Sequence, residues 1–152
     1  MSRPTWDNYF MNIAHVVKTR SNCIKRKVGC IIVDEKEKII LSTGYNGSPR
    51  NMLNCMEGGC IRCNNKEIKS GENLDICICM HAEENAIIYL KEKTKNMKIY
   101  ITTKPCLTCL TKIVQIGIKN VIYDEEYPLD NIIIEKYFGN VVEIKKNEIK
   151  TK

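Results

Sequence analysis

The sequence predicts an α/β protein, a three-layer α/β/α sandwich built around a five-stranded mixed sheet. A hairpin of two apolar strands comes first, and strand-like and helix-like segments then alternate along the rest of the chain. This order is typical of a sheet covered by helices. The length of 152 residues, of which 43% are hydrophobic, suits one core. We therefore expect a single domain over residues 1–152, with a cysteine-rich insertion at about residues 50–80.

The first elements are an amphipathic helix and the hairpin. Apolar side chains recur at helical spacing behind Thr5, which predicts a helix that ends near Arg20. Two β-branched runs at 28–33 and 39–43 flank a charged turn, so we expect an antiparallel pair. Residues 44–49 form a turn-rich loop.

The second half supplies the remaining layers. Residues 50–79 show no sustained periodicity, and an irregular segment of that length is unusual in a compact domain unless something holds it together. The elements expected after it are, in order, a helix at 81–93, a strand at 99–103, a helix at 105–116 closed by Gly117, a strand at 121–123, a weaker helix at 129–137 and a strand at 141–144.

Composition excludes several classes of function. No apolar run approaches the roughly 20 residues that span a bilayer, so we expect no membrane partner. The net charge of +6 comes from lysines dispersed along the chain, and only 7% of residues are aromatic, which argues against a nucleic-acid partner. The first residues do not resemble a signal peptide. A cytoplasmic location is expected, in the host cytoplasm if the source is a virus.

The nine cysteines are the most informative feature of the composition. Disulfides are rare in a reducing compartment, so clustered cysteines there indicate metal ligation before a disulfide framework. Five of the nine lie in the insertion, which makes a metal ion the natural means of holding that segment.

Two short motifs each open a predicted helix. These are His81-Ala82-Glu83 and Pro105-Cys106-Leu107-Thr108-Cys109. One imidazole and two thiolates would leave the fourth tetrahedral position of a zinc ion open for water, as in catalytic zinc sites. A helix N-terminus favours thiolates at Cys106 and Cys109, and Pro105 suits the first helical turn. The pairing of the two motifs is typical of zinc-dependent nucleobase deaminases.

Glu83 is the predicted catalytic acid and base. It lies about 200 degrees around the helix from His81, so it is poorly placed to bind the same ion but can reach a water on it. Glu84 is interpreted as a solvated carboxylate of the first turn, and His15 as a packing or surface residue. The competing interpretation is a closed structural zinc site in which His81 and Glu83 are incidental.

The chain resembles the cytidine deaminase superfamily, and within it the deoxycytidylate (dCMP) deaminase branch, from about Trp6 to about Ile144. The segments that carry the resemblance are Ser21-Asn22-Cys23, Arg26-Lys27-Val28-Gly29-Cys30, Thr43-Gly44-Tyr45-Asn46-Gly47-Ser48-Pro49, the two motifs above, and Gly117-Ile118 leading to Val121-Ile122-Tyr123. The resemblance implies a cytidine deaminase-like fold and the hydrolytic deamination of dCMP to dUMP for thymidylate synthesis.

The resemblance also implies roles for individual residues. Catalytic zinc would be held by His81, Cys106 and Cys109, with Glu83 as the proton shuttle. The substrate would be contacted by Asn46 at the deoxyribose, Ala82 at the pyrimidine edge and Tyr127 against the nucleotide. The candidates for binding the phosphate are Lys25, Arg26, Lys27 and Arg50, of which we select Arg26 and Lys27.

Regulation is implied in the same way. Family members are homo-hexamers activated by dCTP with Mg and inhibited by dTTP. The loop of Gly44, Tyr45, Asn46 and Gly47 resembles the segment that binds these effectors.

Seven cysteines lie outside the catalytic motif. Cys30 continues an apolar strand, where a buried thiol is ordinary. Some relatives carry a second, structural zinc at positions matching Cys23, Cys55 and Cys79. We expect Cys60 to be the fourth ligand, with Cys63 and Cys77 as alternates.

Three other functions remain open from the sequence. The chain could deaminate both dCMP and dCTP, or a base in tRNA or single-stranded nucleic acid, since the same motif serves flipped bases. It could also be a non-catalytic zinc-binding module. An intact Glu83 argues against the last, because a purely structural site needs no carboxylate beside an open position.

Overall fold

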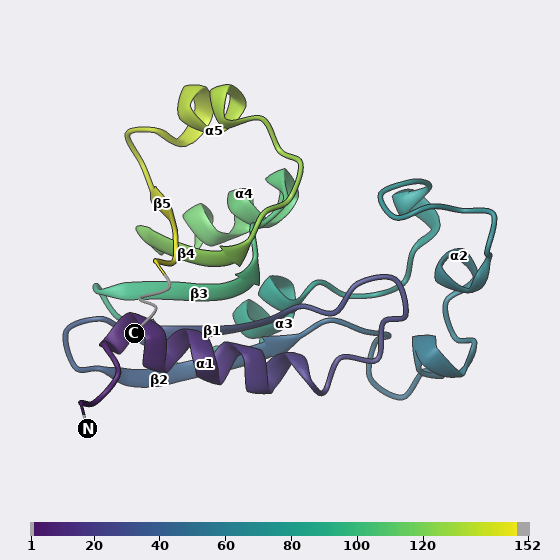
Figure 1. The fold of residues 1–152 in the computed structure, drawn as a ribbon, viewed down its shortest axis with the longest axis horizontal. Coiled ribbons are helices and arrows are strands. Elements are labelled where there is room, and N and C mark those ends of the chain that lie inside the picture. The colour runs from purple at the N-terminus through teal and green to yellow at the C-terminus, as the bar shows by residue number, and fades with distance from the viewer. Residues whose placement is uncertain (1, 149–152) are drawn as a thin grey trace.

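The computed structural model describes residues 2–148 (Figure 1). Its five strands form one mixed sheet in the order β2-β1-β3-β4-β5. Strand β1 is antiparallel to β2 and β3, whereas β3, β4 and β5 run parallel. The elements are α1 (Trp6–Lys18), β1 (Gly29–Asp34), β2 (Ile39–Tyr45), η1 (Cys55–Glu57), α2 (Ile61–Asn64), η2 (Leu74–Ile76), α3 (Ala82–Ile88), β3 (Met97–Thr103), α4 (Leu107–Gln115), β4 (Asn120–Glu125), α5 (Asn131–Phe138) and β5 (Glu143–Lys146).

Helices cover both faces of the sheet, which confirms the three-layer prediction. Side chains alternate along β1, so Ile31 packs in one core cluster with α1 and Ile32 in another with α3, α4 and α5. The α1 side is closed by Phe10, and the opposite side by Leu110 of α4. Each layer therefore buries its own apolar cluster against the central strands.

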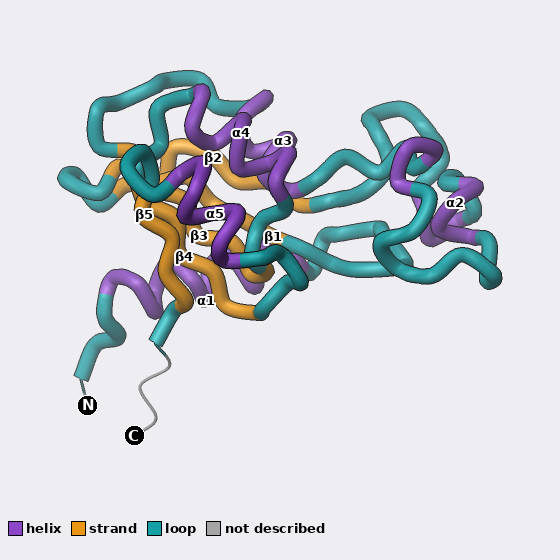
Figure 2. Tube along the Cα trace, turned by 90° about the horizontal axis from the view of Figure 1, so that it is seen from above, coloured by secondary structure: helices purple, strands orange, loops and turns teal. Residues whose placement is uncertain are grey.

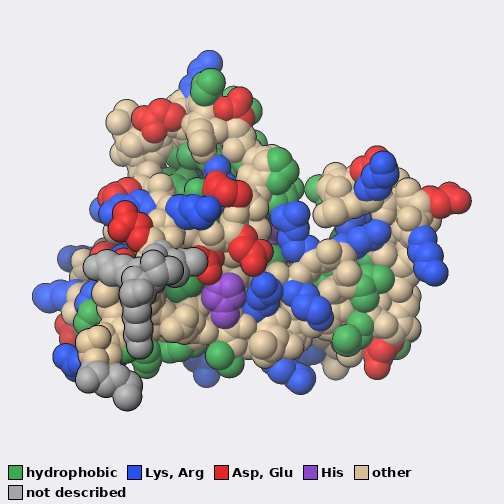
Figure 3. Space-filling model, in the orientation of Figure 1, with side chains coloured by type: hydrophobic (Ala, Val, Ile, Leu, Met, Phe, Trp, Pro, Cys, Tyr) green, Lys and Arg blue, Asp and Glu red, His purple; other side chains and the backbone are tan. Residues whose placement is uncertain are grey.

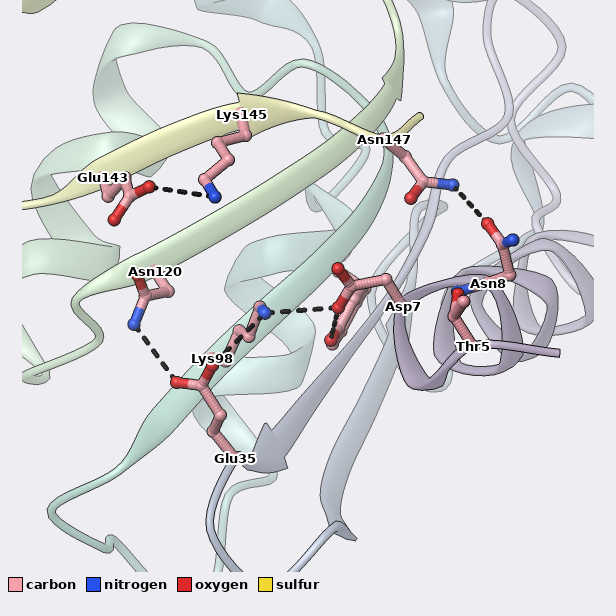
Figure 4. A network of polar contacts seen from close by, with 10 residues as sticks. Thr5, Asp7, Asn8, Glu35, Lys98, Asn120, Glu143, Lys145 and Asn147 are labelled. Carbon is pink, nitrogen blue, oxygen red and sulfur yellow. Dashed lines mark hydrogen bonds and ion pairs between the residues drawn. The ribbon is translucent and has the colours of Figure 1, made fainter. Parts of the chain in front are cut away.

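Polar contacts fix α1 on the sheet and begin at its capped N-terminus (Figure 4). The Thr5 side chain accepts a hydrogen bond from the Asn8 backbone N–H. Asp7 accepts hydrogen bonds from the Tyr100 hydroxyl at 2.6 Å and from Lys98 Nζ at 3.2 Å. Burial raises the pKa of Asp7, but these donors outweigh it and lower the pKa below its usual value. Helix α1 is thereby joined to β3.

Two predicted helix boundaries are wrong. Helix α3 ends at Ile88, well before Lys93, because the Leu90 N–H bonds to the Ile87 carbonyl and Leu90 packs against the core. Pro105 precedes the N-cap of α4, which is Cys106, so it lies just outside the first turn. At the other end of α4, Gly117 has a φ of 100°, the left-handed conformation expected after a helix.

Residues 50–80 form a lobe that stands away from the sheet (Figures 1 and 2). It contains only the short elements η1, α2 and η2. Reciprocal backbone hydrogen bonds between Gly47 and Met80 close its base, directly before His81. The lobe is thus inserted between β2 and α3 and ends at a predicted metal ligand.

The surface agrees with the charge distribution expected from the sequence. On the face shown in Figure 3, basic and acidic side chains are intermixed. Across the described part of the chain, no helix has the length and apolar character that a transmembrane span requires.

Candidate active site and metal centres

The three predicted catalytic ligands meet between the N-termini of α3 and α4. His81 is the N-cap of α3, Cys106 is the N-cap of α4, and Cys109 lies one turn into α4. His81 Nδ1 is 3.3 Å from Cys109 Sγ and 3.7 Å from Cys106 Sγ. In a tetrahedral site, zinc–nitrogen and zinc–sulfur bonds of about 2.05 and 2.3 Å place these atoms about 3.6 Å apart. The donor set and its spacing therefore fit zinc.

Electrostatics prepare these atoms for a cation. The Cys109 thiol donates a hydrogen bond to Cys106 Sγ and lowers the pKa of Cys106 to about 3, despite burial. The Cys106 thiolate in turn raises the pKa of His81 to about 9. At neutral pH these pKa values correspond to a Cys106 thiolate held against a protonated His81, so binding of a metal ion would release the protons of His81 and Cys109.

Glu83 lies beside these three ligands and is buried from solvent. Its side chain is buried and close to the buried Cys30 thiol of β1, whose pKa it helps to raise. Burial raises the pKa of Glu83 to about 7, and its own backbone N–H and the His81 imidazole only partly oppose this. A carboxyl group that titrates near neutrality suits proton transfer in both directions.

Glu84 has a different task from its neighbour. Its carboxylate accepts a hydrogen bond from the His81 backbone N–H at 3.0 Å and pairs with Lys112 Nζ at 2.9 Å. The side chain is only 22% exposed, so it is less solvated than the sequence suggests. Glu84 holds the start of α3 against α4 and thereby sets the position of His81.

Asn46 organises the backbone next to the site. Its Oδ1 accepts hydrogen bonds from Ser21 Oγ at 2.5 Å and Val28 N at 2.8 Å, and its Nδ2 donates to Arg26 O at 2.6 Å. These bonds place the 21–28 segment against the end of β2. Because the next residue, Gly47, pairs with Met80, the same segment lies close to His81.

The structure brings Arg26 and Tyr127 together, and their predicted contact with substrate stays a prediction. The Arg26 guanidinium carbon is 4.9 Å from the centroid of the Tyr127 ring. Among the described residues, Arg26 Nη1 is buried and has no hydrogen-bond partner. Lys27 donates to Ser21 O at 3.1 Å, and Lys25 donates to Ile68 O in the lobe. Among the described residues, Arg26 is therefore the cation of this segment that has a buried donor without a partner.

Ala82 and Gly44 pack closely against each other. Ala82 is fully buried, and its carbonyl oxygen lies where any side chain at Gly44 would have to go. Gly44 is therefore required for β2 to approach α3. The contact between Ala82 and a pyrimidine stays a prediction.

A cavity of about 630 Å³ lies beside the predicted effector loop. Gly44, Tyr45 and Gly47 line it, whereas Asn46 is turned away into the bonds described above. Arg50 and Tyr89 line the other side, with Arg50 Nη2 2.8 Å from the Tyr89 hydroxyl. Arg50 is thus a residue of this cavity, separate from the contact between Arg26 and Tyr127.

The remaining cysteines gather where the lobe meets the 21–28 segment. Four sulfur atoms within 4.8 Å of one another belong to Cys23, Cys55, Cys63 and Cys79. The expected fourth ligand, Cys60, lies instead in a second group with Cys63, Cys77 and Cys79. The expectation for Cys60 is therefore wrong, and the alternate Cys63 is the fourth member of the first group. Cys60 is the N-cap of α2, whereas Cys63 lies within its single turn, so the two sulfur atoms have different neighbours.

Sequence reasoning missed several residues around these sites. Asn22 accepts hydrogen bonds from Ser48 N and Cys55 N and so joins the 21–28 segment to the lobe. Lys104 is buried and donates to Asn131 Oδ1 at 2.7 Å, next to Pro105. A lysine directly before the metal motif is a signal that could have been used. His15 Nε2 is 2.6 Å from Asp124 Oδ2 in a partly buried pair, and neither residue belongs to the metal-ligand groups.

Known proteins resemble the chain over most of its length. The model of the cytidine and deoxycytidylate deaminase zinc-binding region matches residues 4–125. The deoxycytidylate deaminases of Saccharomyces cerevisiae and Schizosaccharomyces pombe are 48% and 50% identical over 86% and 85% of this chain. The chain spans only 41% and 40% of their lengths.

A solved structure shares the architecture as well. The dCMP deaminase of cyanophage S-TIM5, in complex with dCMP and dUMP, is 28% identical with a TM-score of 0.73, covering 97% of this chain and 100% of that one. The family model covers well over half of the sequence and includes Glu83 and the three predicted ligands of the catalytic zinc. The chain therefore belongs to the cytidine and deoxycytidylate deaminase zinc-binding family.

Proposed function

We propose that this chain hydrolyses dCMP to dUMP and ammonia with one catalytic zinc ion. The observation that carries the proposal is the meeting of His81, Cys106 and Cys109 beside the buried carboxyl of Glu83. The relatives named above, one of them solved with dCMP and dUMP, support this choice of substrate.

The chain's own residues account for the proton transfers. When bound, zinc supplies a Lewis acid that makes water acidic enough to attack near neutral pH. Glu83 takes a proton from the attacking water as the new C–O bond forms, and delivers it to the pyrimidine ring nitrogen. It then passes the proton of the added hydroxyl group to the amino group, so that the C–N bond breaks, a C=O bond forms and ammonia leaves. Its pKa of about 7 lets Glu83 both accept and release a proton at neutral pH.

Arg26 and Tyr127 are proposed to hold the nucleotide, with Lys27 nearby. The free, buried Arg26 Nη1 offers a charge-assisted hydrogen bond to the phosphate. The Tyr127 ring packs against the guanidinium and limits its movement. Asn46 positions this segment through Arg26 O and keeps a second amide hydrogen for the deoxyribose.

Replacing Arg26 by alanine should raise KM for dCMP about 10- to 100-fold, because a charged hydrogen bond contributes about 1.5–3 kcal/mol. The rate with deoxycytidine, which lacks the phosphate, should change much less. Steady-state assays on both substrates measure this, and Lys36→Ala in the exposed β1–β2 turn is the matched control. Equal losses on dCMP and deoxycytidine would contradict a phosphate contact.

The cavity beside Gly44, Tyr45 and Gly47 is the proposed effector site, for dCTP with Mg as activator and dTTP as inhibitor. Its volume of about 630 Å³ is that of a small-molecule site. Arg50 stacks on Tyr89 and offers a cation to a triphosphate.

Replacing Arg50 by alanine should raise the dCTP concentration that gives half-maximal activation by about tenfold or more, because one charged contact to the triphosphate is lost. Activity titrated with dCTP and Mg measures this, again beside Lys36→Ala. An unchanged dCTP response would assign the effectors to another surface.

The proposed assembly is a homo-hexamer, and exposed apolar side chains of α1 would be available for its subunit interfaces. Trp6, Tyr9 and Val16 of α1 are exposed by 50%, 43% and 67%. Within each copy, the sheet and the lobe would form one catalytic domain. Light scattering coupled to gel filtration gives the mass of the assembly.

A panel of substrates tests the function as a whole. Ammonia release is expected from dCMP, in preference to cytidine, CMP, dCTP and a single-stranded oligonucleotide. Release from the oligonucleotide alone would show a nucleic-acid deaminase, and equal rates on dCMP and dCTP a bifunctional enzyme.

A further inference from the structure

All six cysteines outside the catalytic motif and β1 belong to one continuous sulfur cluster. The first group holds Cys23, Cys55, Cys63 and Cys79, and the second holds Cys60, Cys63, Cys77 and Cys79. Cys63 and Cys79 are members of both groups. The two groups are therefore two four-sulfur cages that share one edge.

The sulfur spacings match the edges of zinc–thiolate tetrahedra. A zinc–sulfur bond of about 2.3 Å gives a tetrahedron whose sulfur–sulfur edge is about 3.8 Å. The Sγ–Sγ distances are 3.8 Å for Cys60–Cys77, 3.7 Å for Cys63–Cys77 and 4.0 Å for the shared pair Cys63–Cys79. The second group thus has the dimensions of a metal site even though the first group already offers four ligands.

The lobe has almost nothing else to hold it together. Its buried residues are Cys55, Cys60, Arg62 and Cys63. Ile68, Ile78 and Met80 are partly buried, and Ile78 packs on the cysteines. The other large apolar side chains of the lobe are at least half exposed, namely those of Met52, Leu53, Met56, Ile61, Leu74 and Ile76. This small amount of apolar burial offers little to hold Cys60 and Cys77 near each other, whereas a second metal ion would hold them directly.

Arg62 supplies a charge that the cluster would need. It is 3% exposed, and its guanidinium donates to Cys63 Sγ at 3.6 Å and to the backbone carbonyls of Glu72 and Lys69. Among the described residues it has no carboxylate partner. A buried cation requires a nearby anion, and Cys63, whose sulfur contacts the guanidinium, would supply one as a metal-bound thiolate.

We propose that the lobe holds two zinc ions bridged by the thiolates of Cys63 and Cys79. One ion is completed by Cys23 and Cys55, and the other by Cys60 and Cys77. Binding releases the thiol protons, and two Zn²⁺ with six thiolates leave a formal charge of −2 beside Arg62. This goes beyond one structural zinc ion and does not depend on the substrate of the enzyme.

Metal analysis of the purified chain tests the proposal. Plasma mass spectrometry should find about three zinc ions per chain, one of them catalytic, and no stoichiometric iron. Cys77→Ser should lower the zinc content to about two, whereas the matched control Cys30→Ala, which removes a buried thiol from β1, should keep three. Two zinc ions in the unchanged protein, or iron in the lobe, would overturn the proposal.

A second measurement covers the case in which Cys77→Ser does not fold. After exchange of the unchanged protein with ¹¹³Cd²⁺, the two lobe ions should give separate NMR signals in the all-thiolate region, split by coupling to each other through the shared sulfurs. A single all-thiolate signal, or two signals without mutual coupling, would contradict bridging by Cys63 and Cys79.

Discussion

Glu83→Gln is expected to lower kcat for dCMP by about 10²- to 10⁴-fold, the range that general acid–base groups contribute. Glutamine keeps the shape and hydrogen-bonding capacity of the side chain but can neither accept nor release the required proton. The predicted zinc ligands are His81, Cys106 and Cys109, and Glu83 is not one of them. The zinc content should therefore stay unchanged. Stopped assays of ammonia, together with metal analysis of the same sample, measure both quantities.

The adjacent carboxylate provides the control for this experiment. Glu84→Gln removes the ion pair with Lys112 but keeps a side chain that can accept the His81 N–H bond. A loss of less than about tenfold is expected, because a partly exposed ion pair contributes about 1 kcal/mol or less. If Glu83→Gln retained kcat within tenfold of the original enzyme, Glu83 would not be the proton shuttle.

Cys55→Ser is expected to open the lobe to proteases while leaving the sheet intact. Cys55 belongs to the first sulfur group, and structural zinc contributes about 10–16 kcal/mol to the folding of small thiolate modules. The few buried residues of the lobe cannot replace that contribution. Limited digestion with trypsin, read by mass spectrometry, should show rapid cleavage at the lysines and arginines of residues 50–80.

Cys30→Ala again serves as the control, since it removes a buried thiol that lies outside both sulfur groups. Its lobe should remain as resistant as that of the original protein. Cleavage of Cys55→Ser at an unchanged rate would show that metal does not hold the lobe.

The layered architecture was predictable because its signals are local. The apolar runs of β1 and β2 predict the hairpin, and the alternating order of strands and helices that follows predicts a sheet covered by helices. The strand order and the parallel pairing of β3, β4 and β5 come from the structure. The meeting of His81, Cys106 and Cys109 was predictable for the same reason, because each motif fixes its residues at the start of a helix.

Choices among equivalent cysteines were not predictable. Cys60 and Cys63 are three residues apart on one helical turn, so spacing alone could not decide which one faces Cys23 and Cys55. The end of α3 could not be predicted from the sequence either. The residues up to Lys93 have adequate helix propensity, and the end of the helix at Ile88 depends on how Leu90 packs against the core.

The role of Asn46 depends on long-range contacts in a similar way. Its side chain bonds to Ser21, Arg26 and Val28, which are distant in sequence and meet only after β1 and β2 pair. The sequence could mark Asn46 as functional but could not separate it from Gly44, Tyr45 and Gly47, which line the cavity.

The central claim is that this chain replaces the amino group of dCMP with an oxygen atom from water. The most direct measurement is conversion of dCMP in H₂¹⁸O, with the nucleotide product analysed by mass spectrometry. We predict dUMP that carries one ¹⁸O atom on the base, released together with one ammonia. An absence of dUMP, or dUMP formed without ¹⁸O on the base, would contradict hydrolytic deamination.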